Sequence, residues 1–200
     1  MKKAIQVLLC AVMILMISTG IWGCTSEPVT TAPATRVVTD IAGRTVTVPS
    51  NPKKVATMPG PIYEIVFMLG AKDQLGLVRD DHARDYPLAL LTNPDLTSYP
   101  TIANVGPQTP VNVEEYISKG VDLVIYYNIP QELKKFDMAG VPAVVVNWSP
   151  AVPTNIEESV ADLENQIAFT SDVLGGDAPK FYSKRRQYIG TPAVRPVDYR

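Results

Sequence analysis

Short apolar runs alternate with helix-like stretches along most of this chain, and this alternation restricts the possible folds more than any other feature. The two clearest runs cover 121–126 and 142–147, with the sequences VDLVIY and PAVVVN. Both are nearly continuous and rich in β-branched residues, which is typical of strands buried on both faces. Strands that alternate with helices through right-handed crossovers indicate an α/β fold, a doubly wound parallel sheet sandwiched by helices.

The expected elements follow one another in a regular order. Two alternating segments, 36–40 and 45–48, flank a glycine-containing turn and predict an N-terminal β-hairpin. After the hairpin we expect strands at 55–58, 75–78, 102–105, 121–126 and 142–147, and helices at 62–69, 113–118, 131–138, 156–174 and 178–188. Ligands of open parallel sheets bind outside the carboxyl ends of the strands. One mouth is therefore expected from the loops that follow Met58, Val78, Val105, Tyr126 and Asn147.

The helix expected at 156–174 is amphipathic. Its apolar residues recur at helical spacing and share one stripe, made of Ile156, Val160, Leu163, Ile167 and Leu174. Gly175 and Gly176 then end this helix, and Pro179 lies near the first turn of the next one.

The first 23 residues predict a lipoprotein signal peptide. Lys2 and Lys3 precede an apolar stretch at 4–17, and small residues lead to Cys24. The stretch is shorter than the roughly 20 residues of a membrane-spanning helix. The sequence IWGC at 21–24 resembles a bacterial lipoprotein box, although its tryptophan replaces a small residue, and predicts lipidation of Cys24. The alternative is an ordinary signal peptide with an incidental cysteine.

The rest of the N-terminal region and the composition exclude several classes of protein. Residues 24–35 are rich in Thr, Pro and Ala, which predicts a flexible tether. Apolar residues make up 46% of the chain and charged residues 19%, as in ordinary globular proteins. The net charge of −2 becomes −4 when Lys2 and Lys3 leave with the leader, and no basic run occurs. We therefore expect no nucleic-acid partner.

Few residues are suited to catalysis. The only cysteines are Cys10 in the leader and Cys24, so the remaining chain can form neither a disulfide nor a cysteine-based metal cluster. The single histidine, His82, lies beside Asp80 and Asp81 in a densely charged stretch. These side chains could ligate a metal for hydrolysis, but a solvated surface loop is the better interpretation. We expect no enzyme, no metal site and no cofactor.

Several segments, taken in order, resemble the class III periplasmic-binding proteins. They are TDIAGRTVTVPSNPKKVATM, PGPIYEIVFMLGAKDQLGLV, NVGPQTPVNVEEYISKGVDLVI, AGVPAVVVN and the helix IEESV…LENQIAF…DVLGG. The resemblance runs from about Arg36 to Tyr188. Members of this family deliver ferric siderophores, haem and cobalamin to ABC importers. The resemblance thus implies a solute-binding protein with an ABC permease and a small metal-chelate ligand as partners.

The resemblance also implies two α/β lobes joined by one long helix. Residues 36–176 correspond to the N-terminal lobe, 177–189 to the start of the interlobe helix and 190–200 to an irregular tail. Gly190, Pro192 and Pro196 interrupt the helix, because proline inside a helix costs roughly 3 kcal/mol. A second lobe does not follow in the sequence given. We expect a truncated or frame-shifted chain, or one piece of a split protein.

Site residues are carried over from the resemblance and from the expected mouth. Glu64 matches the glutamate that pairs with permease arginines, although a carboxylate in a first helical turn also suits the helix dipole. The expected ligand-binding residues are Gly60, Pro61, Tyr63, Arg79, Tyr86, Gly106, Gln108, Tyr126, Tyr127 and Trp148. Guanidinium groups pair with carboxylate or catecholate oxygens, and aromatic rings suit flat ligands. Tyr126 and Trp148 could equally pack beneath the loops as core.

Two functional hypotheses result. The first is an exported solute-binding protein, lipid-anchored to the outer face of the cytoplasmic membrane or periplasmic, which captures an iron chelate or a cobalamin-type ligand. The second is a truncated surface lipoprotein lobe without ligand-binding activity.

Overall fold

The computed structural model describes residues 34–81, 87–103, 110–146 and 152–189. A hairpin of β1 (Thr35–Thr39) and β2 (Thr45–Pro49) comes first, with antiparallel pairing. The main sheet is parallel, with five strands in the order β5-β4-β3-β6-β7. Its strands are β3 (Val55–Thr57), β4 (Leu75–Arg79), β5 (Thr101–Ile102), β6 (Leu123–Tyr126) and β7 (Ala143–Val145).

Helices and helical turns connect the strands. They are α2 (Gly60–Met68), η1 (Lys72–Gln74), α4 (Pro87–Thr92), η2 (Pro94–Ser98), α5 (Val113–Ser118), α6 (Pro130–Ala139), α7 (Ile156–Leu174) and α8 (Ala178–Ile189). No helix in the described part of the chain is both long enough and apolar enough to cross a membrane. Nor do three or more metal-ligating side chains gather anywhere within the described ranges.

The strand order places the change of direction between β3 and β6. From β3 the chain winds outward through β4 to β5, and then returns through α5 to β6 on the other side of β3. Val55 pairs with Leu123 and Thr57 with Ile125, so the carboxyl ends of β3 and β6 lie level. This is the switch point at which open parallel sheets form a crevice.

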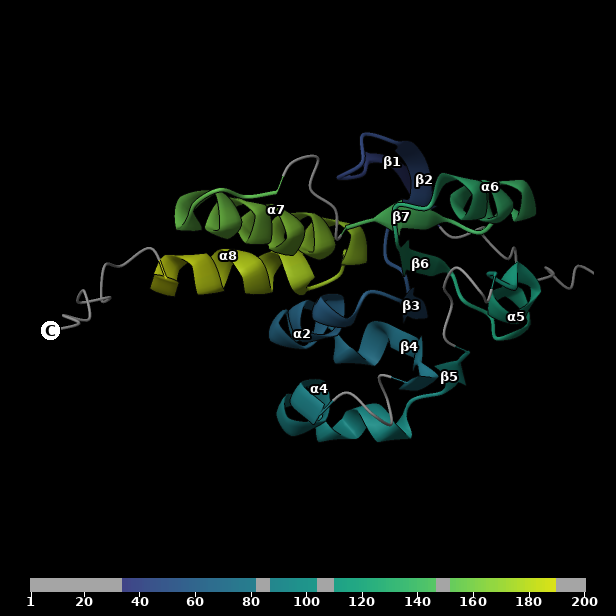
Figure 1. Ribbon diagram of the computed structural model, residues 1–200, viewed down its shortest axis with the longest axis horizontal. Helices are drawn as coiled ribbons and strands as arrows, with labels where there is room; N and C mark the ends of the chain where they lie inside the picture. The colour runs from purple at the N-terminus through teal and green to yellow at the C-terminus, as the bar shows by residue number, and fades with distance from the viewer. Residues whose placement is uncertain (1–33, 82–86, 104–109, 147–151, 190–200) are drawn as a thin grey trace, which may run out of the picture. The chain divides into compact units, whose positions relative to one another are not determined.

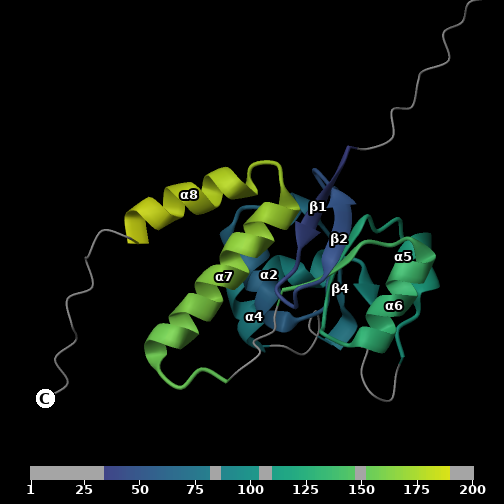
Figure 2. The same ribbon diagram turned by 90° about the horizontal axis from the view of Figure 1, so that it is seen from above.

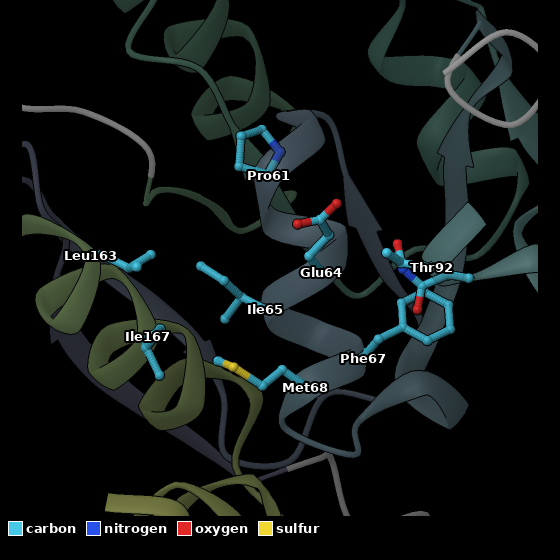
Figure 3. Close-up of a pocket in the computed structure, with 9 residues that line it drawn as sticks. Pro61, Glu64, Ile65, Phe67, Met68, Thr92, Leu163 and Ile167 are labelled. Carbon is cyan, nitrogen blue, oxygen red and sulfur yellow. The ribbon is translucent and has the colours of Figure 1, made fainter. Parts of the chain in front are cut away.

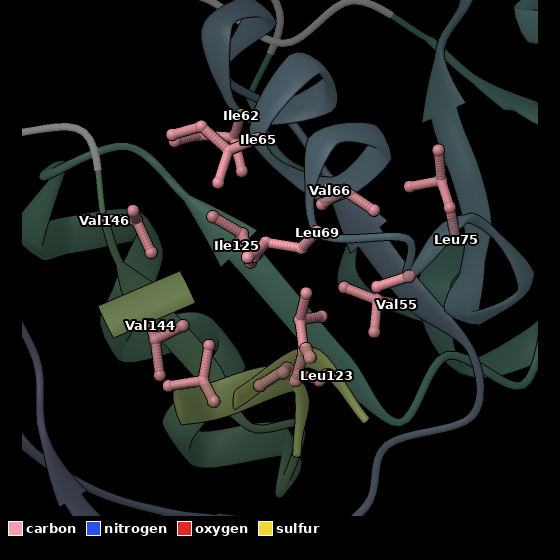
Figure 4. Packing of buried hydrophobic residues seen from close by; sticks show 14 of the residues in the cluster. Val55, Ile62, Ile65, Val66, Leu69, Leu75, Leu123, Ile125, Val144 and Val146 are labelled. Atoms are coloured by element: carbon pink, nitrogen blue, oxygen red, sulfur yellow. The ribbon is translucent and has the colours of Figure 1, made fainter. Parts of the chain in front are cut away.

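Alternation along the strands produces two apolar layers. On β6, Leu123 and Ile125 pack with α2 and the end of α7, while Val124 and Tyr126 pack with α5 and α6. Figure 4 shows the first layer, in which Ile65 of α2 and Leu69, the residue that follows α2, lie over Ile125. Figure 1 shows α5 and α6 on one side of the sheet and α2 and α7 on the other. The three-layer sandwich predicted from the sequence is confirmed.

The hairpin is attached to the sheet edge through Asp40. This buried carboxylate accepts hydrogen bonds from the backbone N–H groups of Arg44 (2.8 Å) and Val145 (3.1 Å). The N–H of Ile41 donates to the carbonyl of Val145 (3.2 Å). The predicted hairpin is therefore confirmed and lies against β7.

Side chains at the start of α7 and just before it cap the helix. Asn155 accepts a hydrogen bond from the N–H of Glu158 (2.9 Å), and Glu158 accepts from the N–H of Thr154 (2.7 Å). This reciprocal arrangement is a variant of the capping box. At the end of α6, Gly140 has φ 69°, the left-handed conformation that glycine adopts without a steric penalty.

Several expected boundaries are confirmed and others differ. Helix α5 has the predicted bounds, and α6, α7 and α8 agree within a residue or two. Strand β5 contains only Thr101 and Ile102, and residues 104 and 105 of the expected strand lie outside the described residues. The sequence analysis did not predict α4, η1 or η2, because these turns are too short for a periodic pattern to show.

Candidate functional site

Three groups meet at the carboxyl ends of β3, β4 and β6. Arg79 is the last residue of β4, Tyr127 follows β6, and the carbonyl of Met58 follows β3. The Tyr127 hydroxyl donates to the Met58 carbonyl (3.1 Å) and accepts a hydrogen bond from Nη1 of Arg79. The guanidinium carbon lies 6.0 Å from the centroid of the Tyr127 ring. We call Arg79, Asp81 and Tyr127 the mouth cluster.

Asp81 holds Arg79 through two hydrogen bonds. Nε of Arg79 donates to Oδ1 (3.0 Å) and Nη2 donates to Oδ2 (2.6 Å), which is the bidentate geometry of a strong ion pair. The side chain of Arg79 is 12% exposed and that of Asp81 is 31% exposed. The pair therefore lies at the surface of the lobe, with the carboxylate more accessible than the guanidinium.

Burial and charge set the protonation states in the mouth cluster. Burial lowers the pKa of Arg79, but the hydrogen bond and charge of Asp81 together with Tyr127 outweigh it and leave the pKa raised. Burial also raises the pKa of Tyr127, and the Arg79 charge only partly offsets this. At neutral pH the Arg79 guanidinium is therefore charged within its ion pair with Asp81, and the Tyr127 phenol is protonated.

Tyr63 supports the mouth cluster from beneath. This side chain of α2 is fully buried, and its hydroxyl accepts a hydrogen bond from the backbone N–H of Arg79 (2.8 Å). Burial raises its pKa, so the hydroxyl stays protonated. Tyr63 thus fixes the end of β4 against α2, and its ring lies within the core instead of facing the mouth.

Tyr126 points to the other side of the sheet. It is fully buried, its ring centroid lies 5.1 Å from that of Phe136, and its hydroxyl donates to Oε2 of Glu132 (2.6 Å). Burial, with Glu132 next, raises the pKa of Tyr126. The structure thus favours the alternative in which Tyr126 is core beneath the loops, while the adjacent Tyr127 reaches the mouth.

Glu132 is a buried carboxylate that the sequence analysis missed. Its Oε1 accepts the backbone N–H of Val111 (3.1 Å) while Oε2 accepts the Tyr126 hydroxyl. It therefore ties α6 both to the end of β6 and to the segment that precedes α5. A glutamate in the first turn of a helix suits the helix dipole when it is exposed, so the sequence offered no signal of burial.

The predicted residues of α2 lie beside a separate hollow. Gly60 is buried at the first turn of α2, Pro61 is exposed, and Glu64 is partly exposed. Oε1 of Glu64 is buried and has no hydrogen-bond partner among the described residues. The hollow measures about 480 Å³. Figure 3 shows its lining, made of Pro61, Glu64, Ile65, Phe67, Met68, Thr92, Asn93, Leu163 and Ile167.

Five predicted site residues lie outside the described residues. These are Cys24, Tyr86, Gly106, Gln108 and Trp148, and their roles stay predictions. His82 lies outside as well, whereas Asp80 is described and accepts a hydrogen bond from the N–H of Asp81 (2.8 Å).

Comparisons with known proteins give matches among solved structures alone. No protein-family model matches the sequence, and no curated protein matches it. The molybdate periplasmic binding protein MolA of Haemophilus influenzae superposes with a TM-score of 0.62 at 18% identity over 74% of this chain. A periplasmic solute binding protein of Veillonella parvula gives 0.61 at 24% identity over 78%, and the petrobactin-binding protein YclQ of Bacillus subtilis gives 0.55 at 14% over 78%.

These similarities decide the fold. The chain has the fold of periplasmic solute-binding proteins. The three matches cover 48%, 45% and 50% of the solved chains, so this chain spans about half the length of each. The fold that the sequence resemblance implied, that of one lobe of a two-lobe binding protein, is therefore confirmed. In this fold the mouth cluster lies at the strand ends, beside the switch point between β3 and β6.

Proposed function

We propose that this chain is the solute-binding component of an ABC importer, which captures a metal chelate and delivers it to the permease. The single observation that carries the proposal is the mouth cluster, where the Arg79–Asp81 ion pair and the Tyr127 phenol meet beside the switch point of the sheet. Ligands of open parallel sheets bind at such a point. The proposed ligand is a ferric siderophore, haem or a cobalamin-type molecule.

The donors of Arg79 support an oxygen-rich ligand. A guanidinium carries five N–H groups. The contacts with Asp81 and Tyr127 use three of them, and the described residues make no further contact with the other two. Carboxylate or catecholate oxygens of a chelate would fit these donors, and the Tyr127 ring offers an aromatic face to a flat ligand.

The names of solved structures with this fold agree with a metal-containing ligand. They include proteins described as binding molybdate, petrobactin and heme. In our proposal Glu64, on α2, docks onto arginines of the permease, and Cys24 carries the lipid that holds the exported chain at the outer face of the cytoplasmic membrane. A periplasmic location without lipid is the alternative for export.

A second candidate function follows from the length of the chain. A ligand held between two lobes would meet only one of them here, because the chain spans about half of the solved proteins. The alternative is therefore a surface lipoprotein lobe that binds no ligand.

Titration of the full chain with haem, cyanocobalamin and ferric enterobactin separates the two candidates. Saturable quenching of tryptophan fluorescence by one probe is expected if the chain captures a chelate. Replacing Arg79 by Ala should weaken that binding about tenfold to a hundredfold, the usual range for a lost charge-assisted hydrogen bond. The matched control, Lys135→Ala, removes one positive charge from the exposed face of α6 and should leave affinity unchanged. Binding of none of the three probes would leave the ligand-free lobe as the function.

A further inference from the structure

The charged residues of the mouth loops all belong to one stretch of the chain. Residues 79–86, which begin at the end of β4, include two arginines and three aspartates, a formal charge of −1 with His82 neutral. None of the other four mouth loops, each between a strand and the next helix, contains a charged residue. They cover residues 58–59, 103–112, 127–129 and 146–155. The mouth loops therefore have no excess of positive charge, although they include Arg79.

The helices that follow these loops do not supply the missing positive charge. The first turns of α2 and α4 contain no charged residue. In the first turns of α5, α6 and α7 the charged residues are Glu114, Glu115, Glu132, Glu157 and Glu158. The helix dipole favours carboxylates at these positions, so the helices themselves explain them. No lysine or arginine in these turns offsets the charge of residues 79–86.

Arg79 is neutralised by its own neighbour. Asp81 binds the Nε–Nη2 edge of the guanidinium, an edge through which an arginine can hold a ligand carboxylate by two parallel hydrogen bonds. Of the two side chains Asp81 is the more exposed, so an incoming ligand meets the carboxylate before the guanidinium. An anionic group at the remaining donors of Arg79 would lie close to this carboxylate, and like charges repel at such separations.

The position of β4 brings this ion pair to the expected ligand. β4 is an inner strand and pairs with β3, one of the two strands at the switch point. Figure 2 shows β4 between α2 and α4 on one side and α5 and α6 on the other. A ligand at the switch point therefore lies next to Arg79 and Asp81.

We propose that Asp81 determines the charge of the ligand, so that the mouth binds a chelate without net negative charge and excludes anionic ones. Neutral iron hydroxamates and neutral corrinoids fit this rule, whereas ferric catecholates and haem do not. The inference rests on the proposed function and narrows its ligand class. The donors of Arg79 alone would accept charged and uncharged oxygens equally, and the Asp81 carboxylate selects between them because an anion beside it would stay unpaired.

Two matched pairs of probes separate charge from shape. Cyanocobalamin is compared with its monocarboxylate, in which one side-chain amide is hydrolysed. N-acetyl ferrioxamine B is compared with N-succinyl ferrioxamine B, which contains the same iron complex. The first member of each pair is neutral and the second is anionic. In fluorescence titrations of the full chain we expect the neutral member of a binding pair to bind about fivefold more tightly, and added salt to reduce the difference by screening.

Asp81→Asn should remove this preference. Asparagine keeps a carbonyl oxygen that can accept from Arg79 but carries no charge, so the ratio of the two dissociation constants should move about tenfold toward the anionic member. Asp81→Glu keeps the charge and should keep the preference. The matched control, Asp73→Asn, removes an exposed carboxylate in η1, which precedes β4 and so lies at the opposite edge of the sheet. It should leave the ratio unchanged.

The possible outcomes distinguish this inference from the proposed function. If an anionic member, haem or ferric enterobactin binds more tightly than the neutral probes, the proposed function stands and the charge selectivity is wrong. The selectivity is also wrong if Asp81→Asn leaves the ratio unchanged, or if Asp73→Asn shifts it equally. If no probe binds, the proposed function fails and the inference fails with it.

Discussion

The two faces of the parallel sheet differ in how fully their buried polar groups are hydrogen-bonded and their apolar side chains are covered. On the α5–α6 face the rings of Tyr116 and Tyr126 each lie 5.1 Å from that of Phe136, and the Tyr116 hydroxyl contacts the sulfur of Met58 (3.2 Å). The buried carboxylate on that face, Glu132, has partners for both of its oxygens.

The α2–α7 face differs from the α5–α6 face in its buried polar groups and in its apolar side chains. Among the described residues, the buried side-chain oxygens without a hydrogen-bond partner belong to Thr57, Glu64 and Ser171. Glu64 and Ser171 are on α2 and α7, and Thr57 follows Val55 by two residues on β3 and so points to the same side. The apolar stripe of α7 is exposed on this face too. Within the described residues, the α5–α6 face thus satisfies its buried carboxylate, whereas the α2–α7 face leaves buried oxygens unpaired and an apolar stripe exposed.

The largest expected effect tests the completeness of the α5–α6 face. Phe136 is fully buried between two tyrosine rings, so Phe136→Ala should lower the free energy of unfolding by about 3–5 kcal/mol. Chemical denaturation measures this change. Phe181→Ala on α8 serves as the control and should cost less, about 1–2 kcal/mol, because that ring is 42% exposed. Equal losses for the two variants would remove the contrast between the faces.

A smaller loss is expected from the polar link on the same face. Glu132→Ala leaves the Val111 N–H and the Tyr126 hydroxyl without their acceptor, which should cost about 1–3 kcal/mol. Hydrogen exchange at the Val111 amide should become faster in this variant. Glu132→Gln keeps an acceptor oxygen and should retain part of the protection. An unchanged exchange rate in Glu132→Ala would show that the carboxylate does not hold this segment.

On the α2–α7 face we expect a substitution that does not lower the free energy of unfolding. The Thr57 hydroxyl is buried without a hydrogen-bond partner among the described residues, so Thr57→Val removes an unsatisfied group of nearly the same shape. The free energy of unfolding should stay constant or rise by up to about 1 kcal/mol. A loss above about 1 kcal/mol would mean that the hydroxyl has a partner and that this face is more complete than it looks.

The smallest expected effect concerns the exposed stripe. Val160→Gln replaces a side chain that is 49% exposed, and should change the free energy of unfolding at low protein concentration by no more than about 0.5 kcal/mol. Chemical denaturation measures the change, and a loss above about 1 kcal/mol would show that the chain covers this side chain more than its exposure indicates.

Much of this architecture could be predicted from periodicity. β-Branched runs marked β6 and β7, and the convergence of strand ends predicted correctly that Arg79 and Tyr127 would lie at one edge. Periodicity could not separate Tyr126 from Tyr127, because adjacent strand residues face opposite sides and the register decides which one reaches the mouth. The burial of Glu132 depends on a contact with Val111, which is 21 residues away, and no local pattern encodes it.

The apolar stripe of α7 also shows that a local sequence pattern does not reveal long-range contacts. Its spacing correctly predicted a helix with one apolar face, from Ile156 to Leu174. Spacing reports that a face is apolar, and not which part of it the same chain covers. The burial of Leu174 and the exposure of Ile156 follow from the position of α2, which contacts only part of α7.

The reciprocal cap formed by Thr154, Asn155 and Glu158 has a consequence for recognition. Because Asn155 accepts the Glu158 amide and Glu158 in turn holds Thr154, local side chains fix the start of the exposed half of α7 without tertiary contacts. A partner would meet a rigid surface, and little conformational entropy would be lost when the two associate. The encounter would then be limited by diffusion and orientation, with no folding step to slow it.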